Sequence, residues 1–152
     1  MIKLLTELER LQEFACELGI DVVDVRRFSA KKGACMKNGE TSVVFINKLQ
    51  IENSTEELCV LAEEVGHIEE NSVLPCGDWL HPSIQYWNKR KNEITAQRWA
   101  INELLPFCVL KAAMLKGYRE RWELAEYLDR PEWFIVKAIE YYSRLGLLPI
   151  LE

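Results

Sequence analysis

The sequence predicts an α+β fold that is mostly helical and contains one small β-hairpin. Helical spacing of apolar residues recurs along most of the chain, whereas only one stretch combines β-branched residues with a turn signal. The length of 152 residues fits one domain with a core of ordinary size. We therefore expect a single domain over 1–152, in which residues 1–105 carry the hairpin and the functional site and residues 106–152 form a helical region.

The first predicted element is a helix over residues 3–18. Its apolar side chains follow helical spacing, at Leu4, Leu8, Leu11, Ala15 and Leu18. Gly19 comes directly afterwards, and glycine often ends a helix. Residues 20–28 alternate poorly between apolar and polar, and they predict a connector with a short extended piece.

Residues 33–50 predict the hairpin. The run Val43, Val44, Phe45 and Ile46 is β-branched and aromatic, and Asn38-Gly39 is a favoured pair for a tight turn. An edge strand beside a catalytic helix can hold an extended peptide by backbone pairing. A hairpin that only covers the core would explain the same residues.

A third predicted element is a helix that begins at Ser54, because Ser54 and Glu57 have the spacing of a capping box. Its apolar stripe is formed by Leu58, Leu61, Ala62 and Val65. Residues four apart lie one above the other on a helix, so Glu63 and His67 share the face nearly opposite this stripe.

Glu63, Glu64 and His67 have the spacing of the H-E-x-x-H metalloprotease helix, with glutamate in place of the first histidine. In that motif the histidines bind zinc and the glutamate acts as general base. An ordinary solvated helix face explains the same three residues without a metal. Helix geometry alone therefore leaves both interpretations open.

A second helix offers a partner for this face. Over residues 89–105 one face is shared by Glu93, Ala96, Gln97, Ala100 and Leu104. The alanines would let another helix approach closely, and a buried carboxylate among them needs a partner. His67, or a cation held between the two helices, would supply it. Alternatively, Glu93 is solvated near the start of its helix, where the helix dipole favours a negative charge.

Between the two helices, residues 71–88 predict a loop, because Pro75, Gly77 and Pro82 interrupt any period. The loop carries His81 and Tyr86 beside the candidate site. A long aromatic loop in this position is suited to form a lid or a pocket wall.

The C-terminal region predicts three helices, over 106–116, 120–128 and 131–145. Gly117 and Gly146 end the first and the last of them. Asp129 is expected to cap the last helix, and Pro131 fits its first turn. The last two helices look like a helix-turn-helix.

Charge and composition narrow the classes of function. A net charge of -5 argues against a primary role on nucleic acid, and residues 132–142 are too apolar and aromatic for a recognition helix. The five cysteines are an odd number without a C-x-x-C pair, no signal peptide is evident, and no apolar run approaches the ~20 residues of a membrane helix. We expect a cytoplasmic protein with reduced cysteines, no membrane partner and no direct binding to nucleic acid.

Three motifs together resemble the ImmA/IrrE family of metallopeptidases, in particular members from phages and mobile elements. They are V-F-I-N at 44–47, L-C-V-L-A-E-E-V-G-H at 58–67 and N-E-I-T-A-Q-R-W-A at 92–100. The resemblance is strongest over 44–106. It implies a zincin-like active-site helix with a small sheet packed on it.

The resemblance implies a role for each site residue. His67 corresponds to a zinc ligand, Glu64 to the general base, and Glu93 to the downstream glutamate that completes the metal shell. Glu63 stands where most members have the first histidine and would be the third ligand. A shell of one imidazole and two carboxylates is harder than the usual one, so it leans towards manganese and predicts weaker zinc binding or lower activity. We therefore expect one divalent ion, Zn²⁺ or Mn²⁺.

The oxyanion formed during peptide hydrolysis needs a second donor besides the metal. His81, Tyr86 or a backbone group in the predicted loop could supply it.

The function that the resemblance implies is a metal-dependent endopeptidase that cleaves a specific protein, a transcriptional repressor of a phage or mobile element. A catalytically inactive protein-binding scaffold of the same fold is the alternative that Glu63 favours. A DNA-binding regulator that uses the helical pair over 120–145 is disfavoured by the acidic net charge.

Overall fold

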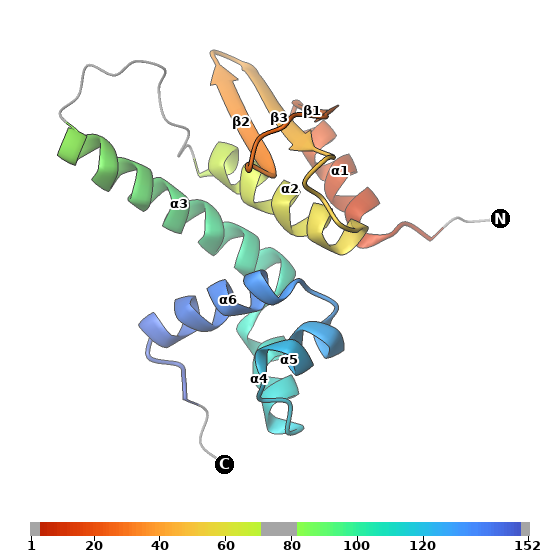
Figure 1. The fold of residues 1–152 in the computed structure, drawn as a ribbon, viewed down its shortest axis with the longest axis vertical. Coiled ribbons are helices and arrows are strands. Elements are labelled where there is room, and N and C mark those ends of the chain that lie inside the picture. The colour runs from red at the N-terminus through yellow and green to blue at the C-terminus, as the bar shows by residue number, and fades with distance from the viewer. Residues whose placement is uncertain (1–3, 71–81, 150–152) are drawn as a thin grey trace.

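The structure, a computed structural model, describes residues 4–70 and 82–149, with the side chains of 82–88 excepted. Within these ranges the chain forms six helices and a three-stranded sheet, which confirms a mostly helical α+β fold (Figure 1). The elements are α1 (Glu7–Glu17), β1 (Ile20–Val25), β2 (Gly33–Asn38), β3 (Thr41–Asn47), α2 (Ser54–Glu69), α3 (Pro82–Leu104), α4 (Phe107–Leu115), α5 (Arg121–Leu128) and α6 (Glu132–Arg144).

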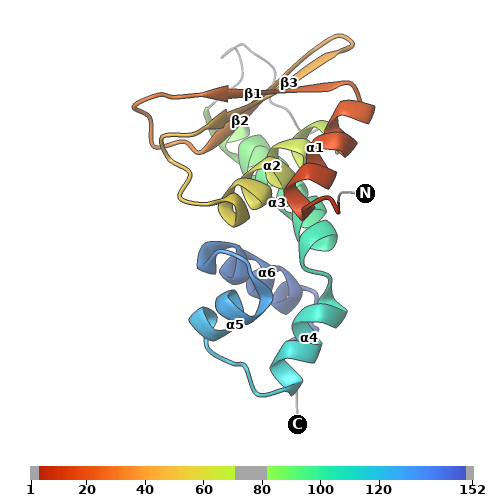
Figure 2. The ribbon, with the colours of Figure 1, turned by 90° about the vertical axis from the view of Figure 1, so that its right-hand side faces the viewer.

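The elements are arranged around α2. The sheet covers α1 and α2 on one side, and α3 packs along α2 (Figure 1). Helices α4, α5 and α6 gather at the end of the molecule opposite the sheet (Figure 2). None of the helices in the described ranges is both long enough and apolar enough to cross a membrane.

The sheet has the order β1-β3-β2 and contains the predicted hairpin. Strands β2 and β3 pair antiparallel, with Asn38 opposite Thr41. The two turn residues are therefore Gly39 and Glu40, one position later than predicted, and Gly39 takes the positive φ of 59° that such a turn requires.

The short extended piece predicted within residues 20–28 is β1, which forms a strand of the sheet parallel to β3 rather than part of a connector. Only Ile20 of this strand is fully buried, so its side chains do not alternate cleanly. Its partner strand begins about 20 residues later in the chain, and local spacing carries no information about that pairing.

Helix α1 begins later than predicted because Thr6 caps it. The Thr6 hydroxyl accepts from the Glu9 backbone N–H at 3.1 Å, and the Glu9 carboxylate accepts from the Thr6 N–H at 2.8 Å. This reciprocal pair satisfies two donors that the first turn leaves open. At the other end, Gly19 follows the capping residue Leu18 with φ 76°, as predicted.

Three other helix boundaries also differ from the prediction. Asn53, rather than Ser54, caps α2, since its side chain accepts from the Glu56 N–H at 2.9 Å. Helix α3 begins at Pro82, so the predicted loop is helical over 82–88, and proline is well suited to a first helical turn. Asp129 does not cap the start of α6, because it ends α5 in a left-handed conformation with φ 53°.

Helices α2 and α3 approach each other closely at Gly66. A Cβ on Gly66 would lie 2.7 Å from the Ala96 carbonyl oxygen and 3.2 Å from the Trp99 Cβ. Ala96 and Ala100 are fully buried at this contact. The close approach that the small residues of α3 predicted is therefore confirmed, and it brings the polar faces of the two helices together.

We expect Gly66→Ala to destabilise the protein. Overpacking typically costs about 1–3 kcal/mol, whereas the higher helix propensity of alanine returns up to about 1 kcal/mol. Thermal unfolding should show a lower Tm than that of the wild type. Glu69→Ala, at an exposed position of the same helix, is the control. Equal Tm values for the two variants would contradict this account of the contact.

The C-terminal helices are attached to the rest of the chain by polar contacts as well as by the core. Arg130, in the turn between α5 and α6, binds both oxygens of Glu7 and the Leu104 carbonyl. The Tyr142 hydroxyl donates to the Leu105 carbonyl at 2.7 Å. Buried apolar residues form one cluster that extends from α1 to α6. These contacts fix α6 against the end of α3.

Candidate active site

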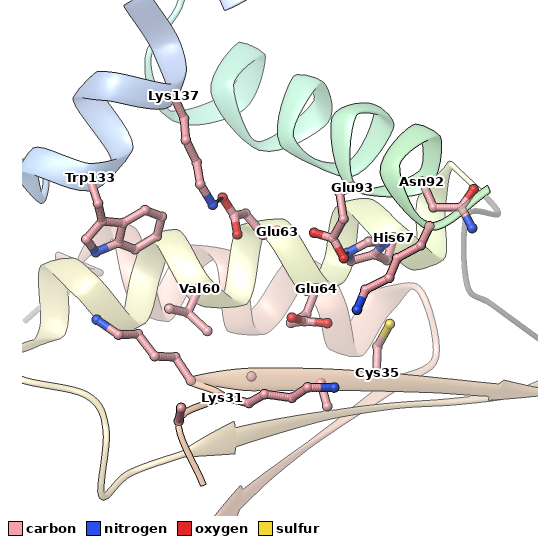
Figure 3. Close-up of a pocket in the computed structure, with 15 residues that line it drawn as sticks. Lys31, Cys35, Val60, Glu63, Glu64, His67, Asn92, Glu93, Trp133 and Lys137 are labelled. Atoms are coloured by element: carbon pink, nitrogen blue, oxygen red, sulfur yellow. Dashed lines mark hydrogen bonds and ion pairs between the residues drawn. The ribbon is translucent and has the colours of Figure 1, made fainter. Parts of the chain in front are cut away.

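A cleft of about 800 Å³ lies between α2, α3, α6 and the edge strand β2 (Figure 3). Charged side chains from three helices line it. Seven lining residues matter for the chemistry of the cleft. They are Cys35 from β2, Glu63, Glu64 and His67 from α2, Glu93 from α3, and Trp133 and Lys137 from α6. The α2 residues of the predicted site thus face a cavity rather than open solvent.

His67 and Glu93 meet across the α2–α3 contact (Figure 3). His67 is buried, with 9% of its surface exposed, and its Nε2 lies 3.6 Å from Glu93 Oε1. A hydrogen bond from His67 is the main cause that lowers the pKa of Glu93. Glu93 lies in the middle of α3 and not at its start, so the helix dipole does not account for it. Its side chain is 48% exposed, so Glu93 is partly solvated as well as paired with His67.

Glu64 points from α2 towards β2, where Cys35 lies (Figure 3). Burial raises the pKa of Glu64, although the positive charge that His67 carries when protonated and a hydrogen bond from the Cys35 thiol oppose the rise. Burial, followed by the Glu64 charge, raises the pKa of Cys35 to about 12, so this thiol remains protonated and donates. A half-buried carboxylate with a raised pKa is suited to accept a proton during a reaction.

Gly33 allows β2 to lie directly on α2. A Cβ at this position would be 2.7 Å from Val60 Cγ1 and 3.1 Å from Glu64 Cγ. Because β2 is an edge strand of the sheet, only one of its two sides pairs with β3. The start of this strand therefore forms a wall of the cleft beside Glu64.

Glu63 has a different partner from the one that the sequence suggested. Its Oε1 accepts from Lys137 Nζ of α6 at 2.8 Å. Burial raises the pKa of Glu63, against the charge and hydrogen bond of Lys137. Of the three predicted ligands, the structure thus brings His67 and Glu93 together and turns Glu63 towards a lysine.

Lys137 and Trp133 are site residues that sequence analysis missed. Lys137 Nζ lies 4.8 Å from the centre of the Trp133 ring, and Trp133 Nε1 donates to Glu56 Oε2 at 3.0 Å. The two residues are four apart on α6, and this spacing indicates that they share a face. It does not indicate that this face meets α2.

The other two candidate residues are not placed. His81 and the Tyr86 side chain lie outside the described residues, although the backbone of Tyr86 belongs to α3. Their suggested role as donors to an oxyanion therefore stays a prediction.

The donor chemistry of the cleft fits a divalent cation only in part. An imidazole nitrogen and a carboxylate oxygen, from His67 and Glu93, are ligands for Zn²⁺ or Mn²⁺. Across the described side chains, however, no three His, Cys, Asp or Glu groups come close enough together to hold a metal ion. The third predicted ligand, Glu63, would first have to leave Lys137.

Comparison with known proteins finds no family model, no curated protein and no solved structure that matches this chain.

Proposed function

We propose that this chain is a metal-dependent endopeptidase that cleaves a specific protein in the cytoplasm. In line with the family that its motifs resemble, the target would be a transcriptional repressor of a phage or mobile element. One observation carries the proposal: Glu64, His67 and Glu93 line a single cleft beside an edge strand.

The edge strand suits an extended peptide as substrate. A peptide that adds to β2 would form backbone hydrogen bonds along the strand. The strand passes next to Glu64, so the bound peptide would lie over the reacting groups. Because backbone pairing is indifferent to side chains, specificity would come from the residues that line the rest of the cleft.

Each site residue has a role in this proposal. His67 and Glu93 would hold the divalent ion, Zn²⁺ or Mn²⁺. Such an ion makes bound water more acidic and polarises the scissile carbonyl. Glu64 accepts the proton of the attacking water and delivers it to the leaving amine. His81 and Tyr86 stay candidates for the donor that stabilises the oxyanion.

Metal content tests the proposal. Protein purified with ample zinc and manganese should contain about one equivalent of either ion, because the cleft holds one pair of donors, His67 and Glu93. Glu93→Ala should lose it, because that substitution removes one of the two donors that meet in the cleft. Elemental analysis measures the zinc and manganese content of both proteins. Metal-free wild-type protein under these conditions would contradict metal-dependent catalysis.

The Glu63–Lys137 ion pair favours a second candidate, a catalytically inactive scaffold that binds a protein in the same cleft. With Glu63 held by lysine, only His67 and Glu93 meet as metal donors. The scaffold would bind its target in the presence of a chelator and leave the target intact. Pull-down of the repressor followed by mass spectrometry separates the two candidates.

A further inference from the structure

We propose that Lys137 is an internal cation that competes with the divalent ion for Glu63 and thereby sets the metal affinity of the cleft. The inference rests on the metal site of the proposed function. Lys137 lies on α6, outside the sequence motifs, and would control whether Glu63 on α2 is available to bind the ion.

The ion pair occupies the position that a third ligand would need. Glu63 lies one turn before His67 on α2, so the two side chains share a helix face. The Glu63 carboxylate instead bonds to Lys137 at 2.8 Å, with the two side chains 16% and 30% exposed. A half-buried ion pair of this kind is screened less by solvent than a surface pair.

Lys137 is held in place rather than loose. Its ammonium lies over the Trp133 ring at 4.8 Å, and Trp133 is itself bound to Glu56 of α2. Phe134, Ile135 and Ala138 of the same helix are fully buried in the core. The lysine is therefore directed into the cleft by the packing of α6 (Figure 3).

The charges explain why the pair matters for metal binding. Relative to the H-E-x-x-H pattern, Glu63 replaces a neutral ligand with a negative one, and Lys137 cancels that charge. A divalent ion that recruits Glu63 must break the ion pair and also bind near an ammonium group, and both effects oppose it. The same cleft thus offers two donors when Lys137 holds Glu63 and three when it does not.

The test is a calorimetric titration with Mn²⁺ and with Zn²⁺, without any substrate. Lys137→Gln should bind the ion about tenfold more tightly or better than wild type, because a positive charge is removed and a negative ligand is released. Glu63→Gln alone should weaken binding, because it leaves the Lys137 ammonium near the ion without its counter-charge. In the Lys137→Gln/Glu63→Gln protein the gain should disappear, since no carboxylate is left to release.

Lys31→Gln is the matched control. Lys31 lines the same cleft, and no carboxylate of the described residues lies within 4 Å of its ammonium. The substitution removes the same charge without releasing a ligand, so the gain in affinity should be small. Thermal unfolding shows whether each variant is folded. If Lys137→Gln does not fold, Lys137→Arg replaces it and should weaken metal binding, because arginine holds a carboxylate with two hydrogen bonds.

Each outcome decides between the proposals. Equal affinities for wild type and Lys137→Gln, or a gain that persists without Glu63, would overturn this inference and leave the metallopeptidase proposal standing if wild type binds the ion. An ion bound by Lys137→Gln but not by wild type would support the inference and contradict metal-dependent catalysis by the natural chain.

Discussion

Glu64→Gln is expected to lower the rate of peptide hydrolysis by about 10²–10⁴-fold, the contribution typical of a general acid–base residue. Glutamine has nearly the same shape, yet its amide does not accept the proton of the attacking water. The fold should be unaffected, because the side chain keeps its place between α2 and β2. The measurement is cleavage of the repressor, or of a peptide library, followed by mass spectrometry.

Glu69→Gln provides the control, since Glu69 lies on the same helix and is exposed. Peptide binding, measured by fluorescence anisotropy, should be retained by Glu64→Gln even where cleavage is lost. Cleavage at the wild-type rate by Glu64→Gln would remove Glu64 from its assigned role. Loss of binding as well as cleavage would point instead to a role in holding the peptide.

Arg130→Ala is expected to destabilise the fold strongly, although it removes no residue of the apolar core. The guanidinium is buried and binds Glu7, the Leu104 carbonyl and the Asp129 carbonyl, so one residue links α1, α3 and the turn before α6. Its loss leaves a carbonyl without its donor and should lower the free energy of unfolding by about 2–4 kcal/mol. Urea denaturation followed by circular dichroism measures the change.

Arg144→Ala is the matched control, because Arg144 forms an exposed pair with Glu140 and such pairs contribute less than about 1 kcal/mol. Equal free energies of unfolding for the two variants would contradict the linking role of Arg130.

The contact between Arg130 and Glu7 also predicts that the free energy of unfolding depends on pH. The hydrogen bond from Arg130 lowers the pKa of Glu7 below 4.5. The pair therefore stabilises the fold above that pH, and its contribution is lost as the pH falls through the lowered pKa. The part of the pH dependence of the free energy of unfolding that comes from Glu7 should be absent in Arg130→Ala.

Local spacing was sufficient to predict most of the helices and the hairpin. The hydrophobic period of each helix depends on residues within two or three turns, so it can be read without knowledge of the partner. The same reasoning placed Glu63, Glu64 and His67 on one helix and Glu93 on a small-residue face of another. The contact between Gly66 and Ala96 then brought His67 to Glu93, as the alanines suggested.

Features that join distant segments were not predicted. The place of β1 in the sheet was not predicted, because its partner β3 lies elsewhere in the chain and its own side chains are only partly buried. The start of α3 was missed because Pro82 breaks a local period but is also compatible with a first helical turn.

The sequence by itself determined the fold class and the helix faces, and it suggested the four residues on which the proposed metallopeptidase would depend. Tertiary structure alone decided what Glu63 does, because its partner Lys137 is 74 residues away. The physical reason is that helical spacing specifies which side chains share a face, whereas the packing of α6 against α2 specifies which faces meet. Whether the cleft offers three metal donors or two depends on that packing.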